Sequence, residues 1–527
     1  MKIAFWTPLP PTRSGIAHYS SMLLPELARL HDVTAVVATE DDVEEFERFS
    51  AGRTPFRVLA ADKGEADADG FDLAIYQLGN NPHHEFIYRQ ALRRAGLVVL
   101  HEVVLHHLIV EMTLARGKAG AYVETMRRNH GQAGAAWAEG RVAGLHGEIG
   151  NFLFPASVEV ASSALAVIVH NEYARERLRS FGVGERIEVI AHPFIERRDG
   201  TAAANSDSLL ARRRALGAEP GDRLAGVFGF VTSAKRIDVV MEAFARAASR
   251  EPRLRLAIVG EPAPNIDLPS IAETCGLERR LWTATGYVPE ESFDRYLEAV
   301  DCVVNLRYPT AGETSGALIR TFAVGRAVAV SQYAQFAEYP PEVATPIPIA
   351  AGEVDALTAF LLAEGPQPTA VAQWRWLKEH CGLAGTVARY SAAVDSVVGH
   401  ARVDTSRAAA IQPSFPLFPN LAVSSLEVSV EKGSALVRLS VVNGGPGTLR
   451  GRTYGEVSYR MIVKLLCGGL EVGSRWVELP SDLGRGAAAH CELSLPASTG
   501  KLTLELHHAI EEIENPLSRP WFRAEIP

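Results

Sequence analysis

Short apolar runs alternate with longer stretches of helical periodicity along most of the chain, and this alternation constrains the fold more than any other feature. In the first part of the chain the runs lie at residues 2–6, 33–37, 73–76, 97–100 and 166–169. Strands separated by helices favour a parallel sheet, because each parallel pair needs a long crossover connection. The sequence therefore predicts a Rossmann-like, doubly wound α/β domain over residues 1–195.

A second and cleaner alternation follows a charged stretch of small residues at 197–214, which we interpret as an interdomain linker. Its apolar runs lie at residues 225–230, 254–259, 281–286, 302–305 and 327–331. We expect a second Rossmann-like domain over residues 215–400. Parallel sheets bind ligands at the carboxyl ends of their strands, so two such domains predict a ligand in the cleft between them.

The pattern changes near residue 415 to strictly alternating runs, such as 426–430 and 436–441, with a turn at 443–446. Short strands separated by Gly and Pro turns predict a small all-β sandwich of immunoglobulin-like type over residues 415–527. Trp476, Trp521 and Phe522 either stack on sugar faces there or pack in its core. The predicted fold class is therefore α/β, with two Rossmann-like domains followed by a β-sandwich.

Composition narrows the kinds of partner. A net charge of −9 without a basic block argues against nucleic acid. No apolar window approaches the length of a membrane span, and the run at 2–6 is too short for a signal-peptide core. The five cysteines form no CxxC pair and read as reduced thiols. We expect a cytoplasmic protein whose only membrane contact, at the inner face, would be peripheral.

The segment at 308–318 follows a predicted strand and opens a helix. Backbone N–H groups at a helix N-terminus attract anions, so we expect a diphosphate over the residues Ser315, Gly316 and Ala317. Glu313 lies beside that position. Its carboxylate either accepts hydrogen bonds from sugar hydroxyls or caps the helix start.

Lys235 and Arg236 stand in the loop after the first strand of the second domain, just before a helix. A fixed cation there stabilises the negative charge that develops on a departing nucleoside diphosphate, without a metal. The alternative is a solvated basic pair. Positive charge at a helix start opposes the helix dipole, which favours the functional interpretation.

His101 ends a strand of the first domain and is placed to touch a substrate across the cleft, unless it is a core histidine. A zinc-binding H-E-x-x-H is excluded, because Leu105 stands where the second histidine is needed. Asn80, Asn81 and His83 follow another strand and either line the acceptor side or form a polar turn. Gly15, after the first strand, offers a backbone N–H either to a phosphate or to the acceptor.

Three common motifs are absent. There is no G-x-G-x-x-G after the first strand and no G-x-x-x-x-G-K-[ST], which argues against a dehydrogenase or a P-loop nucleotidase. No G-x-S-x-G elbow of a hydrolase appears either.

Taken together, residues 1–400 resemble the retaining GT-B glycosyltransferases of family four. The residues that carry the resemblance are Thr7-Pro8 through Gly15-Ile16, His101-Glu102, 169–172, 190–193, 235–238, 257–260 and 312–331. The resemblance implies transfer of a hexosyl group with retention, from a GDP- or UDP-sugar to a glycan or lipid-linked acceptor in polysaccharide synthesis. It implies no metal and no further cofactor.

By the same resemblance His101 would bind the donor sugar, Lys235 would hold the diphosphate and Glu313 would contact sugar hydroxyls. Gly286, Tyr287 and Val288 would bracket the nucleobase. The sequence departs from the family pattern in three ways. Gly312-Glu313 is followed by Thr314-Ser315-Gly316, which predicts a shorter loop than the family has. Arg320 stands in place of a second glutamate, where it either pairs with the diphosphate or faces solvent. Phe230 stands in place of an arginine, which leaves Arg236 as its substitute.

Two other functions remain open from the sequence. A GT-B sugar-nucleotide epimerase shares the double domain but needs no acceptor, and the appended sandwich favours transfer. A glycan-binding scaffold with a degenerate site would account for Arg320 and Phe230, although His101, Lys235 and Glu313 are retained. Binding of a nucleoside diphosphate distinguishes the scaffold from both enzymes.

Overall fold

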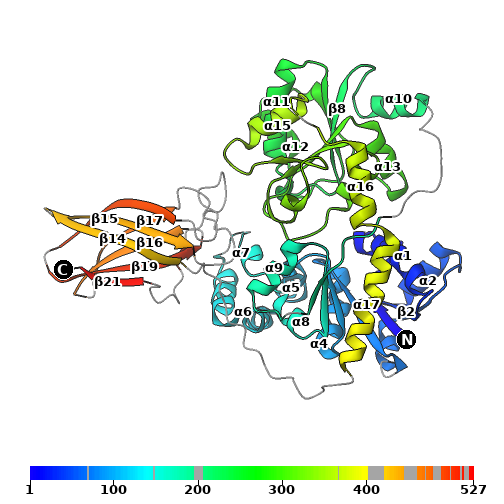
Figure 1. The fold of residues 1–527 in the computed structure, drawn as a ribbon, viewed down its shortest axis with the longest axis horizontal. Helices are drawn as coiled ribbons and strands as arrows, with labels where there is room; N and C mark the ends of the chain where they lie inside the picture. Colours follow the sequence, from blue (N-terminus) through cyan, green and yellow to red (C-terminus); the bar gives the residue numbers. More distant parts are fainter. Residues whose placement is uncertain are drawn as a thin grey trace. The chain divides into compact units, whose positions relative to one another are not determined.

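The computed structural model describes residues 1–67, 70–145, 147, 149–184, 186–194, 206–365, 367–401, 421–431, 433–443, 460–468, 470–478, 488–498, 500–510, 513–514 and 522–526. Two parallel sheets are built from the first 400 residues (Figure 1). The expected α/β class, with two Rossmann-like domains and antiparallel sheets after them, is confirmed.

The first sheet has the strand order β3-β2-β1-β4-β5-β6-β7, and every neighbouring pair is parallel. The strands are β1 (Lys2–Trp6), β2 (Asp32–Val37), β3 (Arg57–Ala60), β4 (Leu73–Leu78), β5 (Leu97–Leu100), β6 (Ala166–Val169) and β7 (Ile187–Val189). All five expected runs are strands, and β3 and β7 are additional edge strands.

Helices connect these strands. They are α1 (Gly15–Leu27), α2 (Glu40–Ser50), α3 (Ala61–Ala66), α4 (Glu85–Arg93), α5 (His106–Met112), α8 (Val158–Ser162) and α9 (Glu172–Ser180), with 3-10 turns at η2 (Pro82–His84) and η3 (Leu114–Arg116). Between α5 and α8 the chain forms α6 (Ala119–Val142) and α7 (Gly150–Leu153). Helix α6 bends at His130, whose Nε2 accepts a hydrogen bond from Ala156 N at 2.9 Å.

The second sheet has the order β10-β9-β8-β11-β12-β13, again parallel. Its strands are β8 (Arg223–Phe228), β9 (Leu254–Val259), β10 (Trp282–Ala284), β11 (Cys302–Asn305), β12 (Ala327–Ser331) and β13 (Thr345–Ile347). Its helices are α10 (Ser206–Ala215), α11 (Ile237–Arg250), α12 (Leu268–Thr274), α13 (Glu290–Ala299), α14 (Gly316–Ala323), α15 (Glu353–Leu361) and α16 (Ala370–His380), with 3-10 turns η4 (Ser233–Lys235), η5 (Arg279–Leu281) and η6 (Ala334–Glu338).

Each face of the second sheet has its own hydrophobic core. One core joins the sheet to α11, α12 and α15, and the other joins it to α14 and α16. Helices on both faces define a doubly wound sheet. In such a sheet the ligand crevice lies where the strand order reverses, here between the carboxyl ends of β8 and β11.

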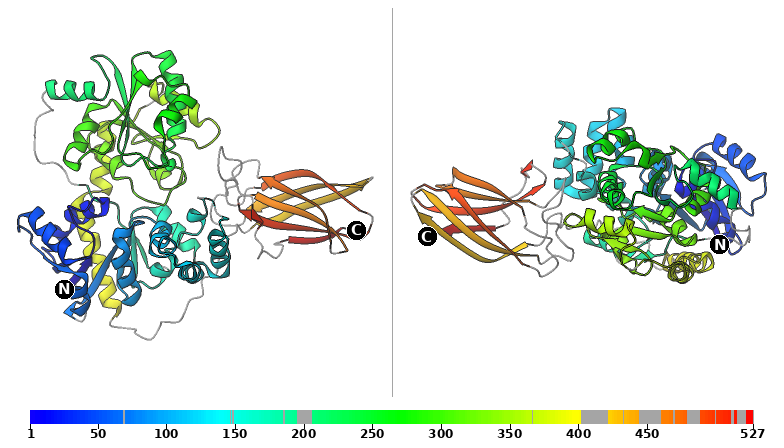
Figure 2. Two further views of the ribbon diagram at one scale, coloured as in Figure 1. Left: turned by 180° about the vertical axis from the view of Figure 1, so that it is seen from behind. Right: turned by 90° about the horizontal axis from the view of Figure 1, so that it is seen from above.

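The last helix of this region, α17 (Leu383–Ala401), packs on the first sheet and beside α1, where the yellow helix meets the blue one in Figures 1 and 2. The hydroxyls of Tyr19 and Tyr390 are 2.5 Å apart. The two segments that cross between the domains also touch, because Phe194 N donates to Cys381 O at 2.7 Å. The chain therefore passes twice between the domains at one place.

The interpretation of residues 197–214 as a linker is wrong for its second half, which forms most of α10. Arg213 fixes this helix to the second domain through an ion pair with Asp301 at 2.9 Å and a hydrogen bond to Ala299 O at 2.8 Å. The cluster of charges that suggested a linker is thus the polar face of a helix.

Two antiparallel sheets follow and share one core. One contains β14 (Leu421–Glu431), β15 (Ser434–Asn443) and β18 (Ala488–Pro496), and the other contains β16 (Arg460–Cys467), β17 (Leu470–Glu478), β19 (Leu502–Ile510), β20 (Ile513–Glu514) and β21 (Phe522–Ile526). In β18 buried and exposed side chains alternate, as expected for a sheet with one face on the core and one face exposed to solvent. Trp521 lies outside the described residues, and the immunoglobulin-like type stays a prediction.

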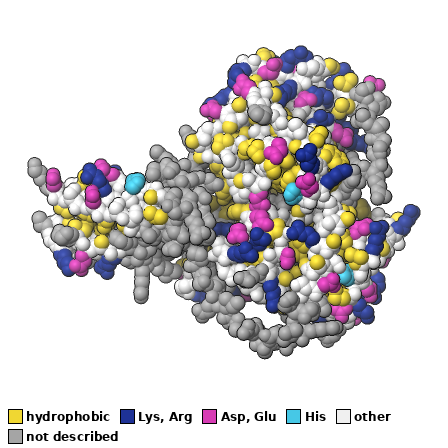
Figure 3. Space-filling model, viewed as in Figure 1, with side chains coloured by type: hydrophobic (Ala, Val, Ile, Leu, Met, Phe, Trp, Pro, Cys, Tyr) yellow, Lys and Arg dark blue, Asp and Glu magenta, His cyan; other side chains and the backbone are white. Residues whose placement is uncertain are grey.

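Three further features bear on partners. Among the described residues no helix is both long and apolar enough to cross a membrane. All five cysteines are free thiols. On the face drawn in Figure 3, Lys and Arg side chains lie among Asp and Glu side chains rather than in one extended basic patch.

Candidate functional site

Lys235 lies at the end of β8, where the strand order reverses. Its side chain is only 3% exposed, and its ammonium donates a hydrogen bond to Phe228 O. Gly229 follows the strand with a φ of +83°, and a Cβ at that position would lie 3.4 Å from Lys235 Nζ. The glycine therefore keeps the space beside the ammonium open.

Glu313 lies across the crevice, in the loop between β11 and α14. Its Oε2 accepts hydrogen bonds from Thr310 Oγ1 at 2.8 Å and from Ala311 N at 3.0 Å. Its Oε1 lies 3.3 Å from Arg307 Nε. The structure thus brings Lys235 and Glu313 to one place and adds Arg307 to them.

Sequence reasoning missed Arg307, although it comes two residues after the apolar run that forms β11. A basic residue just beyond a central strand was the available signal. Burial lowers the pKa of the Arg307 guanidinium and, together with the nearby charge of Arg307, lowers the pKa of Lys235 well below its usual value. Glu313 opposes both shifts. The crevice therefore holds two buried cations and one carboxylate.

The N-terminus of α14 opens beside this cluster. Ser315 is the cap, since its Oγ accepts a hydrogen bond from Leu318 N at 3.3 Å. The Ser315 hydroxyl also donates to Asn305 Oδ1 at 3.1 Å. Gly316 is exposed and Ala317 half-buried, so the backbone of the first turn is accessible. Asn305 Nδ2 is buried without a hydrogen-bond partner among the described residues.

Arg236 and Arg320, the other predicted donor-binding cations, each have an ion pair of their own. Arg236 pairs with Glu353 at 2.8 Å, and both side chains are largely buried. Arg320 pairs with Asp294, and its guanidinium lies 4.3 Å from the centre of the Phe293 ring. Their role in donor binding stays a prediction.

His101, at the end of β5, has both ring nitrogens engaged. Its Nε2 is 2.7 Å from Gln77 Oε1, and its Nδ1 is 3.1 Å from His170 Nε2. The Tyr19 ring packs edge-on against it at 4.6 Å. Burial and the neighbouring histidines lower the pKa of His101 well below its usual value. The ring is therefore neutral near pH 7.

Glu102 is the second acidic side chain of the crevice and was given no role from the sequence. Its Oε1 accepts a hydrogen bond from Asn80 N at 2.8 Å. Burial and, to a smaller extent, the charge of Glu313 together raise the pKa of Glu102 to about 8, against the effect of the Asn80 hydrogen bond. Glu102 is therefore protonated near pH 7, and it lies close enough to Glu313 for the two carboxyl groups to interact.

The three residues predicted to line the acceptor side, Asn80, Asn81 and His83, differ in whether their side chains already make local hydrogen bonds. Asn80 is structural in part, because its Oδ1 accepts a hydrogen bond from Leu108 N at 3.0 Å. Asn81 caps the 3-10 turn η2 by accepting from His83 N at 3.0 Å. The His83 side chain is exposed, and of the three it is the freest to meet an acceptor.

The two α/β domains meet directly beside Glu313. Val103 N donates to Ala311 O at 2.7 Å, and Asn171 Nδ2 donates to Gly312 O at 2.9 Å. Gly312 has a φ of +80°, and an added Cβ would lie 3.2 Å from a methyl group of Val103. A side chain at Gly312 would therefore strain this contact.

The predicted nucleobase end lies after β10. Gly286 has a φ of +71° and open space around it, and Tyr287 is 50% exposed. The Arg13 guanidinium, from the loop after β1, lies 4.6 Å from the centre of the Tyr287 ring. Val288 instead packs against the core of the second domain. Gly15, next to that loop, is exposed with no atom within 4 Å of an added Cβ.

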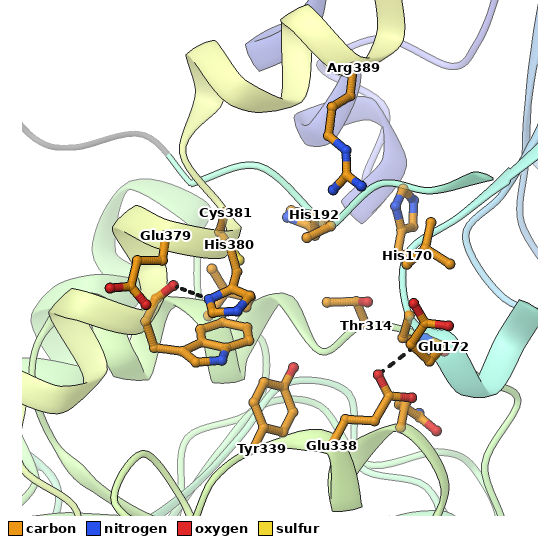
Figure 4. A pocket seen from close by; sticks show the side chains of 16 residues that line it. His170, Glu172, His192, Thr314, Glu338, Tyr339, Glu379, His380, Cys381 and Arg389 are labelled. Carbon is orange, nitrogen blue, oxygen red and sulfur yellow. Dashed lines mark hydrogen bonds between the residues drawn. The ribbon is translucent and has the colours of Figure 1, made fainter. Parts of the chain in front are cut away.

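A cavity of about 260 Å³ is lined by residues of both α/β domains, among them Asn171 and Thr314. Figure 4 shows Arg389 reaching from α17 toward His192 and His170 at its top, with Thr314 and Tyr339 below. Glu338 closes one side, since its carboxylate accepts hydrogen bonds from Glu172 N at 3.1 Å and Tyr173 N at 2.7 Å at the start of α9.

No group of three or more His, Cys, Asp or Glu side chains in the described part of the chain is placed to hold a metal ion. The chemistry available is thus that of cations, backbone N–H groups, a neutral histidine and two interacting carboxyls. Such a set suits a phosphate-bearing ligand with hydroxyl groups.

Comparison with known proteins gives two kinds of match. Residues 223–363 match the family described as Glycosyl transferases group 1. Among solved structures, Anabaena HepE in complex with UDP and glucose is 15% identical with a TM-score of 0.52, covering 75% of this chain and 100% of that chain. Its complex with UDP-glucose has a TM-score of 0.52 at 14% identity and the same coverage.

A glycosyltransferase from Rickettsia africae ESF-5 is 12% identical with a TM-score of 0.52, covering 75% of this chain and 98% of that chain. A comparison with curated proteins finds no match. At these identities the structures show the fold. The chain therefore has the two-domain GT-B fold of these structures, and the match to the Glycosyl transferases group 1 family falls within its second α/β domain.

Proposed function

We propose that this protein is a glycosyltransferase that moves a hexosyl group from a GDP- or UDP-sugar to a glycan or lipid-linked acceptor, with retention and without a metal, in polysaccharide synthesis. The observation that carries the proposal is the crevice of Lys235, Arg307 and Glu313 at the point where the strand order reverses. The two Anabaena HepE complexes, with UDP and glucose and with UDP-glucose, favour a UDP-sugar as donor.

The residues divide the work as follows. Cations beside the β8 end stabilise the charge that grows on the departing diphosphate, and the first turn of α14 supplies N–H groups to the same anion. Glu313 orients the sugar through its hydroxyl groups. His101, held neutral between Gln77 and His170, presents an uncharged ring edge to the sugar rather than a competing cation.

In this proposal most of the catalysis comes from holding the donor sugar in place and from the charges around its diphosphate. An oxocarbenium-like transition state needs a stabilised leaving group and a nearby negative potential, for which we assign the cations Lys235 and Arg307 and the carboxylate of Glu313. The departing phosphate oxygen takes the acceptor proton, so no side chain is assigned as the base. The acceptor enters from the first domain, past His83 and the loop after β4.

The test is thermal stabilisation of the full chain by GDP-, UDP-, ADP- and TDP-sugars in buffer containing EDTA. A ligand that binds the folded state raises the melting temperature by mass action. We expect one nucleotide to raise it, and we expect Lys235→Met to reduce that rise. Product formation with the same donor and a glycan acceptor, followed by NMR at the anomeric carbon, reports retention.

The alternatives make different predictions. An epimerase would convert the bound donor to a second nucleotide sugar with no acceptor present. A scaffold would show no melting shift with any nucleotide, and that result would refute the proposed function. A shift that appears only after Mg²⁺ is added would refute the metal-independent part alone.

A further inference from the structure

Arg307 is a buried cation next to a second buried cation, and this arrangement is costly without an anion. The Arg307 side chain is 14% exposed and the whole of Lys235 is 3% exposed. Each is desolvated, which lowers the pKa of each, and the charge of Arg307 lowers the pKa of Lys235 further. Glu313 alone compensates for both, which leaves an excess of positive charge in the crevice.

The contacts of Glu313 are unequal. Its Oε2 is held by two neighbours in its own loop, Thr310 Oγ1 and Ala311 N. Its Oε1 has Arg307 as its charged partner, at 3.3 Å. An anion that takes over Arg307 would therefore release Oε1 without displacing the loop that holds Oε2.

The other two arginines predicted to bind the donor, Arg236 and Arg320, are paired differently. The Arg236 guanidinium is neutralised by buried Glu353, and Arg320 by Asp294. Arg307 is the one of the three whose partner is itself a predicted substrate-binding residue. That coupling distinguishes it from a structural ion pair.

We propose that Arg307 binds the diphosphate of the donor together with Lys235, and that Glu313 is its counter-ion until the donor arrives. This inference rests on the proposed function and names a residue and an exchange within the same site. When the diphosphate pairs with Arg307, Glu313 Oε1 is freed to accept a hydroxyl of the donor sugar. The sugar-binding carboxylate is thus withheld until the phosphates are in place.

The experiment measures affinity for the nucleoside diphosphate and the nucleoside monophosphate of the preferred base, by isothermal titration of the full chain. Arg307→Gln should weaken the diphosphate by about 10- to 100-fold, the range for a charge-assisted contact, and leave the monophosphate nearly unchanged. The monophosphate also reports that the variant is folded. Arg307→Lys keeps the positive charge and should reduce diphosphate affinity less than Arg307→Gln does.

Glu313→Gln gives the sharper result. Removing the internal anion should tighten binding of the diphosphate by roughly threefold or more, because Arg307 no longer has a competing partner. The same variant should lower turnover of the nucleotide sugar. In the double variant Arg307→Gln/Glu313→Gln the gain in diphosphate affinity should vanish.

Arg213→Gln is the matched control, since Arg213 has a similarly buried side chain, 15% exposed, and pairs with Asp301 in the same domain. Arg213→Gln should lower the stability of the protein and leave its affinity for the nucleoside diphosphate unchanged. Two results would overturn the inference: equal diphosphate affinity in wild type and Arg307→Gln, or no gain in diphosphate affinity in Glu313→Gln. In either case, binding of the diphosphate by the wild type would still support the proposed function. Absence of binding in the wild type would overturn both.

Discussion

Asn171 of the first α/β domain donates a hydrogen bond to the Gly312 carbonyl of the second at 2.9 Å, and its Oδ1 also accepts from Ala174 N at 2.8 Å. One buried side chain therefore caps α9 and fastens the loop that carries Glu313. The contact between the two domains and the position of the Glu313 loop are therefore coupled through this residue.

Asn171→Ala should lower both stability and turnover. Loss of the cap costs about 1 kcal/mol, and loss of the interdomain bond adds a similar amount. Asp267→Ala is the control, because Asp267 caps α12 by accepting from Ser270 N and lies outside the site. Urea titration and steady-state kinetics should show reduced stability in both variants and reduced kcat in Asn171→Ala alone. Equal kcat in the two variants would contradict the coupling.

Glu102 gives a pH-dependent prediction. Its pKa in the folded protein is about 8, above the ordinary carboxyl value, so folding favours the protonated form. Stability is lost as the pH rises toward 8, because the unfolded chain releases this proton earlier. Glu102→Gln should therefore be more stable than wild type by a few kcal/mol above pH 8 and similar below pH 5. Melting temperatures across pH 5–9 provide the check, with the exposed Glu44→Gln as control. A constant difference would be inconsistent with a raised pKa.

Donor binding should weaken as the pH rises, and Lys235 should account for part of that loss. Burial and the charge of Arg307 hold the pKa of Lys235 well below the usual lysine value, so this ammonium loses its charge at a lower pH than an exposed lysine does. The diphosphate then loses one of its two cations. Isothermal titrations across a pH series measure the affinity for the nucleoside diphosphate. We expect a shallower dependence on pH in Lys235→Met, and the same dependence in wild type and Lys235→Met would argue against a lowered pKa of Lys235.

Arg236 and Glu353 form a buried pair whose disruption should be costly. Arg236→Ala leaves the Glu353 carboxylate, which is 2% exposed, without its cation and should destabilise the protein by about 3–5 kcal/mol. The double change Arg236→Met/Glu353→Leu should restore much of this loss. Denaturant unfolding measures both variants. A loss below about 1 kcal/mol in the single variant would mean that water reaches the pair.

Most of the fold could be predicted from the sequence because central parallel strands are continuous apolar runs. The runs at β1, β5, β6, β9, β11 and β12 were predicted with the bounds that the structure has. The edge strands β3, β7 and β13 were missed. They are short and partly exposed, with Arg57, Glu188 and Pro346 interrupting the apolar signal.

The site was predictable where a residue stands next to a strand end, as with Lys235, Glu313 and His101. Partners distant in sequence were not. The pairing of Arg236 with Glu353 joins positions 117 residues apart, and nothing local indicates it. Arg307 also follows a strand end, but it was missed because it lies outside the residues that carry the family resemblance.

The two crossings between the α/β domains are tied together where Phe194 N meets Cys381 O and Phe194 pairs with Gly382. The covalent crossings and a backbone hydrogen bond thus coincide at one point. The two domains stay joined there even where side-chain contacts elsewhere between them, such as that of Arg13 with Tyr287, are broken.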